Sequence, residues 1–311
     1  MGRKITLLAC LSFWAATTFA QQDKLITHFI YDKMSINPGE TGIDDGICLT
    51  SIYRNQWDKV NGAPNSAVFN VAANMNRFFP GGIGLSFYHD AIGFNRQNNV
   101  LLNYSYPLQV GDAGTLGIGL GVGIINFGMS PVWVPPTTTI DNTLPVGFNA
   151  TNLDLNFGLY FKGNNDYYFG LSSTHLTQSL LEQNTATGTT QSYQTVRHYY
   201  MMGGKKIRNV LGGDIDIQAL LRTELIKFSG DVNVRYMWRG IAYGGLTYRN
   251  VDAVGIMLGW MPIQNLSIGY SYDVTTNKLA SVSRGSHEIL LKYCFYLPPP
   301  PITKSNHPRW L

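Results

Sequence analysis

Polar and apolar residues alternate along most of the chain, in about fourteen short segments. In the segment 152–162, Leu153, Leu155 and Phe157 fall on one face, while Asn152 falls on the other. A period of two is that of a β-strand whose two faces meet unlike surroundings. The pattern therefore predicts an all-β protein, although a soluble sandwich alternates in the same way as a membrane barrel.

The lengths of the connectors between these segments distinguish a membrane barrel from a soluble sandwich. The predicted strands are 47–57, 66–76, 81–91, 97–107, 114–127, 151–162, 165–177, 194–204, 213–223, 228–238, 241–249, 252–261, 264–273 and 285–296. The longest connectors, 128–150, 178–193 and 274–284, all follow odd-numbered strands, so the long loops gather at one end of the sheet. Long loops at one end and short turns at the other are typical of an outer-membrane β-barrel. We therefore predict a transmembrane antiparallel barrel of about fourteen strands over residues 47–296.

The N-terminus has the pattern of an export signal. Arg3 and Lys4 precede an apolar stretch that is too short to span a membrane as a helix, and a small-x-small cleavage signal ends at Ala20. Residues 1–20 are therefore predicted to be a signal peptide. Residues 21–46 are expected to be a periplasmic N-terminal segment, in which a turn at 37–39 leads into the first strand.

The C-terminal residues 297–311 are expected to form a periplasmic tail, so that both termini lie in the periplasm. Its proline run, 298–301, cannot continue a β-ladder because proline lacks the backbone donor. Arg309, Trp310 and Leu311 form a cationic and aromatic tip suited to docking in a partner's pocket. A disordered tail without a partner is the alternative.

The composition agrees with a barrel. Aromatic residues make up 13% and glycines number 33, while charged residues, at 14%, fall below the usual quarter or so. The net charge of +4 comes without a basic cluster in the sequence, which argues against nucleic acid as a partner.

The same alternation places charges of both signs on the inner face. Arg54 is expected to pair there with a carboxylate, and the other inward polar positions are Asp214, Asp216, Gln218, Arg222, Asp231, Asn233, Arg235, Glu288 and Lys292. They define either a conducting lumen or an interior cross-linked by ion pairs. Apolar residues among them favour the closed interior. Small residues at 117, 119, 121 and 123 share one strand face, which allows close approach of a neighbouring backbone or a filled interior.

Nothing in the sequence predicts catalysis or a cofactor. None of the six histidines has metal-ligand spacing. Ser286 and His287 are adjacent on a strand, so they point to opposite faces and cannot converge with an acid. The expectation is a protein without enzymatic activity, metal or cofactor.

Two cysteines remain after removal of the signal peptide. Cys48 and Cys294 lie in the first and last predicted strands, near the same end, and both face inward. An exported protein meets an oxidising compartment, but a bridge also requires Cα atoms within about 7 Å. The register across the seam depends on the barrel shear. The sequence is therefore compatible both with a disulfide and with two buried free thiols.

Recognition is expected in the extracellular loops. The connector 128–150 holds Val132, Trp133 and Val134, followed by Pro135, an apolar aromatic patch stiffened by proline. Such a patch suits protein binding, because proline lowers the cost of ordering the loop. The loop could equally fold back and plug the barrel mouth.

Short motifs in a fixed order carry a family resemblance. They are Ile36-Asn37-Pro38-Gly39, Tyr53-Arg54-Asn55-Gln56-Trp57, Gly62-Ala63-Pro64, Gly244-Gly245-Leu246-Thr247-Tyr248-Arg249, Gly269-Tyr270-Ser271-Tyr272-Asp273 and Ser286-His287-Glu288-Ile289. With these motifs the chain resembles, from about residue 28 to 296, the PorP/SprF family of Bacteroidetes outer-membrane proteins. Family members tend to have Asn-Pro-Ala-Tyr-Ala-Gly where residues 37–42 here are Asn-Pro-Gly-Glu-Thr-Gly.

The resemblance implies a role in type IX secretion and gliding motility. It implies a component that captures or anchors secreted proteins, such as adhesins, through their C-terminal sorting domain. It further implies coupling to periplasmic ring components or a lipoprotein, with outer-membrane lipid around the barrel. The alternative is a passive porin or a FadL-like transporter of hydrophobic solutes.

Overall fold

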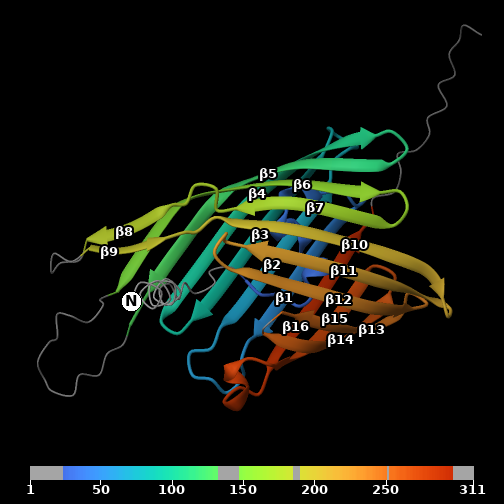
Figure 1. Cartoon of the computed structure of the whole chain (residues 1–311). Helices are drawn as coiled ribbons and strands as arrows, with labels where there is room; N and C mark the ends of the chain where they lie inside the picture. The colour runs from blue at the N-terminus through green and yellow to red at the C-terminus, as the bar shows by residue number, and fades with distance from the viewer. Residues whose placement is uncertain (1–23, 132–146, 185–189, 251, 297–311) are drawn as a thin grey trace, which may run out of the picture.

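The computed structural model describes residues 24–131, 147–184, 190–250 and 252–296. They form a closed antiparallel barrel of 14 strands, as the alternation predicted (Figure 1). The barrel strands are β1 (Ile47–Asn55), β2 (Asn65–Asn74), β3 (Gly82–Ile92), β4 (Asn95–Val110), β5 (Gly114–Met129), β6 (Phe148–Gly163), β7 (Tyr167–Thr174), β10 (His198–Val210), β11 (Gly213–Thr223), β12 (Phe228–Trp238), β13 (Ala242–Arg249), β14 (Ala253–Ile263), β15 (Leu266–Thr275) and β16 (Ser286–Phe295). Among the described residues, no helix is long and apolar enough to cross a membrane.

The two faces of the wall differ as predicted. On β11, Ile217 and Leu221 are exposed on the outer face, whereas Asp216, Gln218 and Arg222 are buried inside. A Lys or Arg turned outward at mid-bilayer would cost about 2–4 kcal/mol. Since a slip of one residue exchanges the faces, this cost fixes the register of each strand.

The connectors divide the barrel into two unlike ends. One end, called here the long-loop end, carries the connectors 56–64, 130–147, 175–197 and 276–285, the last containing η3 (Lys278–Ser281). The opposite, short-turn end carries tight connectors such as 111–113, 211–212 and 264–265. The predicted segregation of long and short connectors is therefore confirmed.

One long connector contains structure that the sequence analysis left as a loop. Within 175–197, β8 (Leu180–Asn184) pairs with β9 (Thr190–Gln194) as a separate two-stranded sheet. The segment is rich in Thr and Gln and lacks apolar alternation. The alternation of polar and apolar residues therefore could not predict this pairing.

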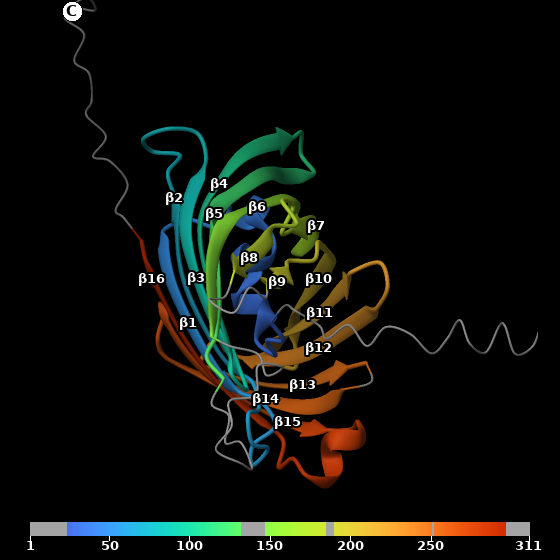
Figure 2. The same ribbon diagram turned by 90° about the vertical axis from the view of Figure 1, so that its left-hand side faces the viewer.

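Residues 24–46 lie inside the barrel, which corrects their assignment to an external periplasmic segment. We call them the plug. The plug contains η1 (Phe29–Tyr31), α2 (Lys33–Ile36) and η2 (Pro38–Glu40), and Figure 2 shows it in blue within the ring of strands. Its His28, Asp32 and Asn37 are completely buried. The expected turn at 37–39 is present as η2, but it packs in the lumen.

The plug runs the length of the lumen. Lys24 lines a chamber at the long-loop end, together with Trp57 and Thr223. The plug then passes to the short-turn end, where β1 begins at Ile47 and β16 ends at Phe295. Residue 24 therefore lies at the long-loop end and residue 296 at the short-turn end. The termini themselves lie outside the described residues, so their placement in the periplasm stays a prediction.

The first and last strands close the barrel. Cys48 and Cys294 are register partners across this seam, with Cα atoms 4.1 Å apart, and their sulfur atoms form a disulfide. The bridge joins residues 246 positions apart in the sequence, so it covalently fixes the closed ring.

Candidate functional site

The candidate site is the lumen, where the plug meets two different walls. The charge wall is the inner face of β1 and β11–β16, and its centre is Glu288. The Glu288 carboxylate accepts hydrogen bonds from the backbone N–H of Thr27 at 2.8 Å and of His28 at 2.7 Å. It also contacts His28 Nδ1 at 2.7 Å and Arg54 Nη1 at 3.2 Å. One carboxylate thus joins the plug to β1 and β16.

Ion pairs extend from this centre around the charge wall. Arg54 Nη2 lies 2.8 Å from Asp273, as expected for an inward arginine, and Asp273 also lies 3.7 Å from Arg249. Arg249 Nε reaches Asp231 at 2.9 Å, and Asp231 pairs in turn with Arg222. All five side chains are buried. The structure therefore has the ion-paired interior that the sequence favoured over a conducting lumen.

The opposite arc, β3–β7, forms the glycine wall. A Cβ atom added to Gly117 would lie 2.0 Å from the Gly39 carbonyl oxygen, and one added to Gly119 would lie 2.2 Å from Gly39 N. A Cβ atom on Gly158 would lie 2.1 Å from Asn37 Oδ1. These distances leave no space for a side chain. The run of inward glycines on β5 therefore serves close backbone approach, one of the two roles predicted for it.

Hydrogen bonds hold the plug against the glycine wall. The Asn37 side-chain amide donates to the Leu159 carbonyl at 2.9 Å. Ser105 donates to the Gly39 carbonyl at 2.8 Å, and Ser172 donates to the Ile36 carbonyl at 2.8 Å. The plug's backbone groups thus find partners in the wall, as buried polar groups require.

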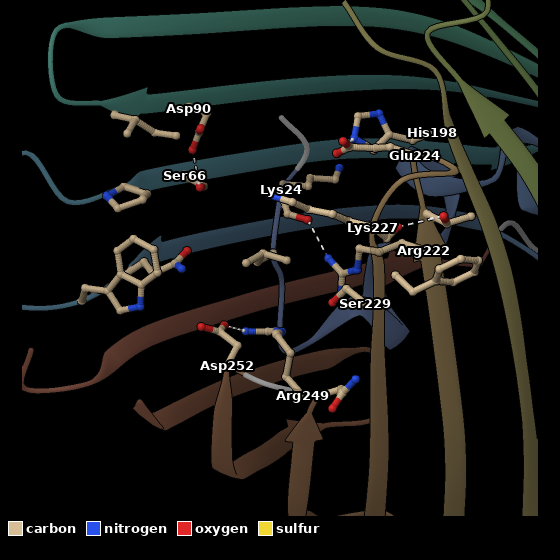
Figure 3. Close-up of a pocket in the computed structure, with 18 of the residues that line it drawn as sticks. Lys24, Ser66, Asp90, His198, Arg222, Glu224, Lys227, Ser229, Arg249 and Asp252 are labelled. Carbon is tan, nitrogen blue, oxygen red and sulfur yellow. Dashed lines mark hydrogen bonds and ion pairs between the residues drawn. The ribbon is translucent and has the colours of Figure 1, made fainter. Parts of the chain in front are cut away.

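A chamber of about 500 Å³ opens above the plug at the long-loop end (Figure 3). Its charges are paired: His198 Nε2 lies 2.8 Å from Glu224, and Arg249 lies 3.4 Å from Asp252. Trp57 also lines this long-loop chamber. It lies beyond the end of β1 and has a φ of 52°, so strand alternation does not govern the direction of its side chain.

A second space, of about 380 Å³, lies below the plug at the short-turn end. This short-turn vestibule is lined by six cationic side chains: Lys33, Lys162, Lys205, Lys206, Arg235 and Lys292. The prediction that the protein has no basic cluster is therefore wrong for the folded chain. The six residues come from the plug, β6, β10, β12 and β16, so only the fold brings them together.

The turn beside this vestibule carries an exposed ion pair. Arg208 donates to both carboxylate oxygens of Asp166, at 2.5 and 2.6 Å. These hydrogen bonds hold the pKa of Asp166 below its usual range. The pair is open to solvent and contributes little to stability.

The remaining predicted site residues have mixed outcomes. Val132, Trp133, Val134 and Pro135, and the tail residues Arg309, Trp310 and Leu311, lie outside the described residues. Ser286 is buried and His287 lies on the other face of β16, bonded to Tyr270, so the two do not converge. Within the described ranges, no group of three or more His, Cys, Asp or Glu residues could hold a metal ion.

Solved structures share the fold at low sequence identity. The CymD monoaromatic hydrocarbon channel aligns with a TM-score of 0.50 and 10% identity, over 86% of this chain and 93% of that one. The P. putida toluene transporter TodX aligns with a TM-score of 0.45 and 7% identity, over 84% of this chain and 93% of that one. At such identity the CymD match shows an outer-membrane barrel fold and nothing further.

Sequence comparison is more specific. No curated protein matches the chain. The family model for the type IX secretion system membrane protein PorP/SprF matches residues 18–293, which includes the plug and almost the whole barrel. The chain therefore belongs to the PorP/SprF family of type IX secretion system membrane proteins.

Proposed function

We propose that this protein is a plugged scaffold of the type IX machinery. At the long-loop end it captures or anchors secreted proteins, such as adhesins, that carry the system's C-terminal sorting domain. At the short-turn end it couples to periplasmic ring components or a lipoprotein attached to them. It carries out no covalent chemistry and uses no cofactor.

The observation that carries this proposal is the filled lumen. The plug occupies the interior from the long-loop chamber to the short-turn vestibule and is held on both walls. The buried charges around the plug are paired with one another. An ion entering the lumen would therefore meet side chains held in ion pairs, and not a continuous column of water. A closed barrel suits binding on its two ends better than passage through its middle.

The lengths of the connectors support the orientation in this proposal. In outer-membrane barrels the long loops are extracellular and the short turns are periplasmic. The long-loop chamber, lined by Trp57, Tyr88 and Phe228 beside paired charges, then faces cargo at the cell surface. Aromatic side chains with a polar rim are the usual composition of a protein-binding surface.

Site-specific photo-crosslinking in intact cells tests both ends. A photo-reactive residue at Phe228, in the long-loop chamber, should form adducts with secreted proteins bearing the sorting domain. One at Tyr167, beside the short-turn vestibule, should form adducts with periplasmic proteins. Leu258, exposed on the outer face, is the control and should give neither. If the adducts at Phe228 in an actively secreting strain contained no secreted protein with the sorting domain, they would contradict the capture role.

The alternative function is a passive porin or a FadL-like transporter of hydrophobic solutes. The fold shared with the CymD channel is the observation in its favour. Transport would require the plug to leave its many contacts on both walls. Conductance and solute-uptake measurements on the intact protein separate the two functions.

A further inference from the structure

The short-turn vestibule has an unbalanced charge. Against its six cationic side chains stand three carboxylates in its lining, Asp44, Asp166 and Asp216. Glu40, half-buried in a small neighbouring pocket that Lys292 also lines, is a fourth. Cations therefore exceed carboxylates even when Glu40 is included. In the lining of the long-loop chamber the charges are closer to balance, with Lys24, Arg222, Lys227 and Arg249 beside Asp90, Glu224 and Asp252.

The carboxylates of the vestibule lining are already engaged. Asp44 pairs with Lys162 at 2.6 Å. Asp216 accepts from Arg235 at 2.5 Å and lies 4.0 Å from Lys206, while Asp166 is held by an arginine of β10. The three carboxylates of the lining are thus paired with two arginines and two of the lysines of this chain.

Three lysines have no carboxylate within ion-pair distance among the described residues, and two of them, Lys33 and Lys292, interact with Glu40 and Asp44 only at longer range. Lys33 Nζ lies 4.0 Å from the centre of the Tyr168 ring, and Lys292 Nζ lies 5.7 Å from that of Tyr31. Lys205, at the rim, donates to a backbone carbonyl of the neighbouring turn. Aromatic rings and a carbonyl offer partial stabilisation, but none neutralises an ammonium group.

We propose that the short-turn vestibule binds an acidic segment, rich in Asp and Glu, of a partner protein at this end of the barrel. This inference rests on the proposed coupling at the short-turn end and names its chemistry. A volume of about 380 Å³ accommodates a few side chains. The Lys162 and Asp44 side chains are half or more exposed, so the vestibule is open to the solution. The surplus charge would steer an anionic segment toward it.

The lining of the vestibule lacks a free arginine, which argues against a dedicated phosphate site. Phosphate sites typically use the planar fork of arginine or the N–H groups of a helix N-terminus. Arg235, the one arginine of the vestibule lining, already donates to Asp216 and to the Tyr31 hydroxyl. Flexible lysine ammonium groups act as point charges and tolerate the variable spacing of carboxylates along an acidic peptide.

Fluorescence anisotropy with a labelled hexaglutamate peptide tests this on the whole protein in a non-ionic detergent. The peptide should bind at low salt, and binding should weaken strongly as salt is raised. The double variant Lys205→Gln/Lys292→Gln, which removes two of the three lysines that have no carboxylate within ion-pair distance, should weaken binding about five- to tenfold, as for two partly exposed ion pairs. Lys59→Gln/Lys278→Gln, which removes the same charge from exposed positions in long-loop-end connectors, should leave it unchanged.

Controls separate the possible outcomes. If Lys205→Gln/Lys292→Gln fails to give a heat-modifiable barrel, the single rim variant Lys205→Gln should still weaken binding about twofold or more. Equal binding of hexaglutamine, or equal loss in the Lys59→Gln/Lys278→Gln control, would overturn the inference. Lysine-dependent binding of inorganic phosphate without hexaglutamate binding would also overturn it. None of these results bears on cargo adducts at Phe228, so the two proposals fail independently.

Discussion

The plug meets the glycine wall and the charge wall in different ways. Against β3–β7 it fits by shape, because Gly117, Gly119 and Gly158 leave room for its backbone and no more. Against β1 and β11–β16 it fits by charge, through Glu288 and the ion pairs linked to it. Shape complementarity fixes where the plug lies, and charge pairing penalises its departure.

The two walls should therefore fail differently. Adding a side chain to the glycine wall removes the space for the plug while leaving the barrel strands paired. Removing a charge from the other wall leaves the space intact, but its buried partner then has no opposite charge beside it. Measurements that separate plug position from barrel stability can distinguish the two kinds of damage.

The largest effect is expected from Gly119→Leu. The new Cβ would lie within 2.3 Å of three backbone atoms of Pro38 and Gly39, none of which can move without the plug. The cost should exceed the ~1–3 kcal/mol typical of overpacking, so the plug should leave the lumen. Trypsin should then cleave after Lys33 in native membranes, where the parent protein resists.

The matched control for that substitution is Gly244→Leu. An added Cβ at Gly244 meets only the end of the Leu258 side chain, at 3.9 Å, on the outer face. Resistance to trypsin should be unchanged. Resistance in Gly119→Leu as well would show that the glycine wall does not position the plug.

The next largest effect is expected from Glu288→Gln. The change removes the charge that faces Arg54 and His28 and weakens the acceptor of two plug N–H groups. Breaking a buried pair in this way costs about 3–5 kcal/mol. The temperature at which the folded band disappears on semi-native gels should fall, and Asp112→Asn, on an exposed turn, should leave it unchanged.

A smaller effect is expected from Asn37→Ala. The substitution removes a donor to the Leu159 carbonyl and the acceptor for Gly39 N, both in buried surroundings. Lost bonds of this kind cost about 1–3 kcal/mol. Hydrogen exchange should speed up in residues 36–42 and stay constant across the charge wall. Uniformly faster exchange would mean that the walls act as one unit.

Local patterns predicted the barrel well. Strand positions, inward and outward faces and the long-loop end all follow from residues a few positions apart, as at Asp216 and Ile217. Glycines at alternate positions of β5 also signalled close backbone approach. These features depend on the two-residue period of side-chain direction in a strand and on the free-energy cost of turning a charge toward lipid.

Features that depend on register or on distant elements could not be predicted. The Cys48–Cys294 pairing needs the shear of the closed barrel, which no local pattern encodes. The plug has no strand alternation, and its position depends on contacts with strands that are distant in the sequence. The short-turn vestibule joins lysines such as Lys33 and Lys292, which are 259 residues apart in the sequence (292 − 33).

Single-channel conductance in planar bilayers tests the central claim, that the plug closes the lumen, most directly. The intact protein should show no steady conductance at either polarity. Gly119→Leu, with the plug expelled, should show steady open levels in the same bilayers. A large and steady conductance of the intact protein would contradict the closed lumen and would favour a channel.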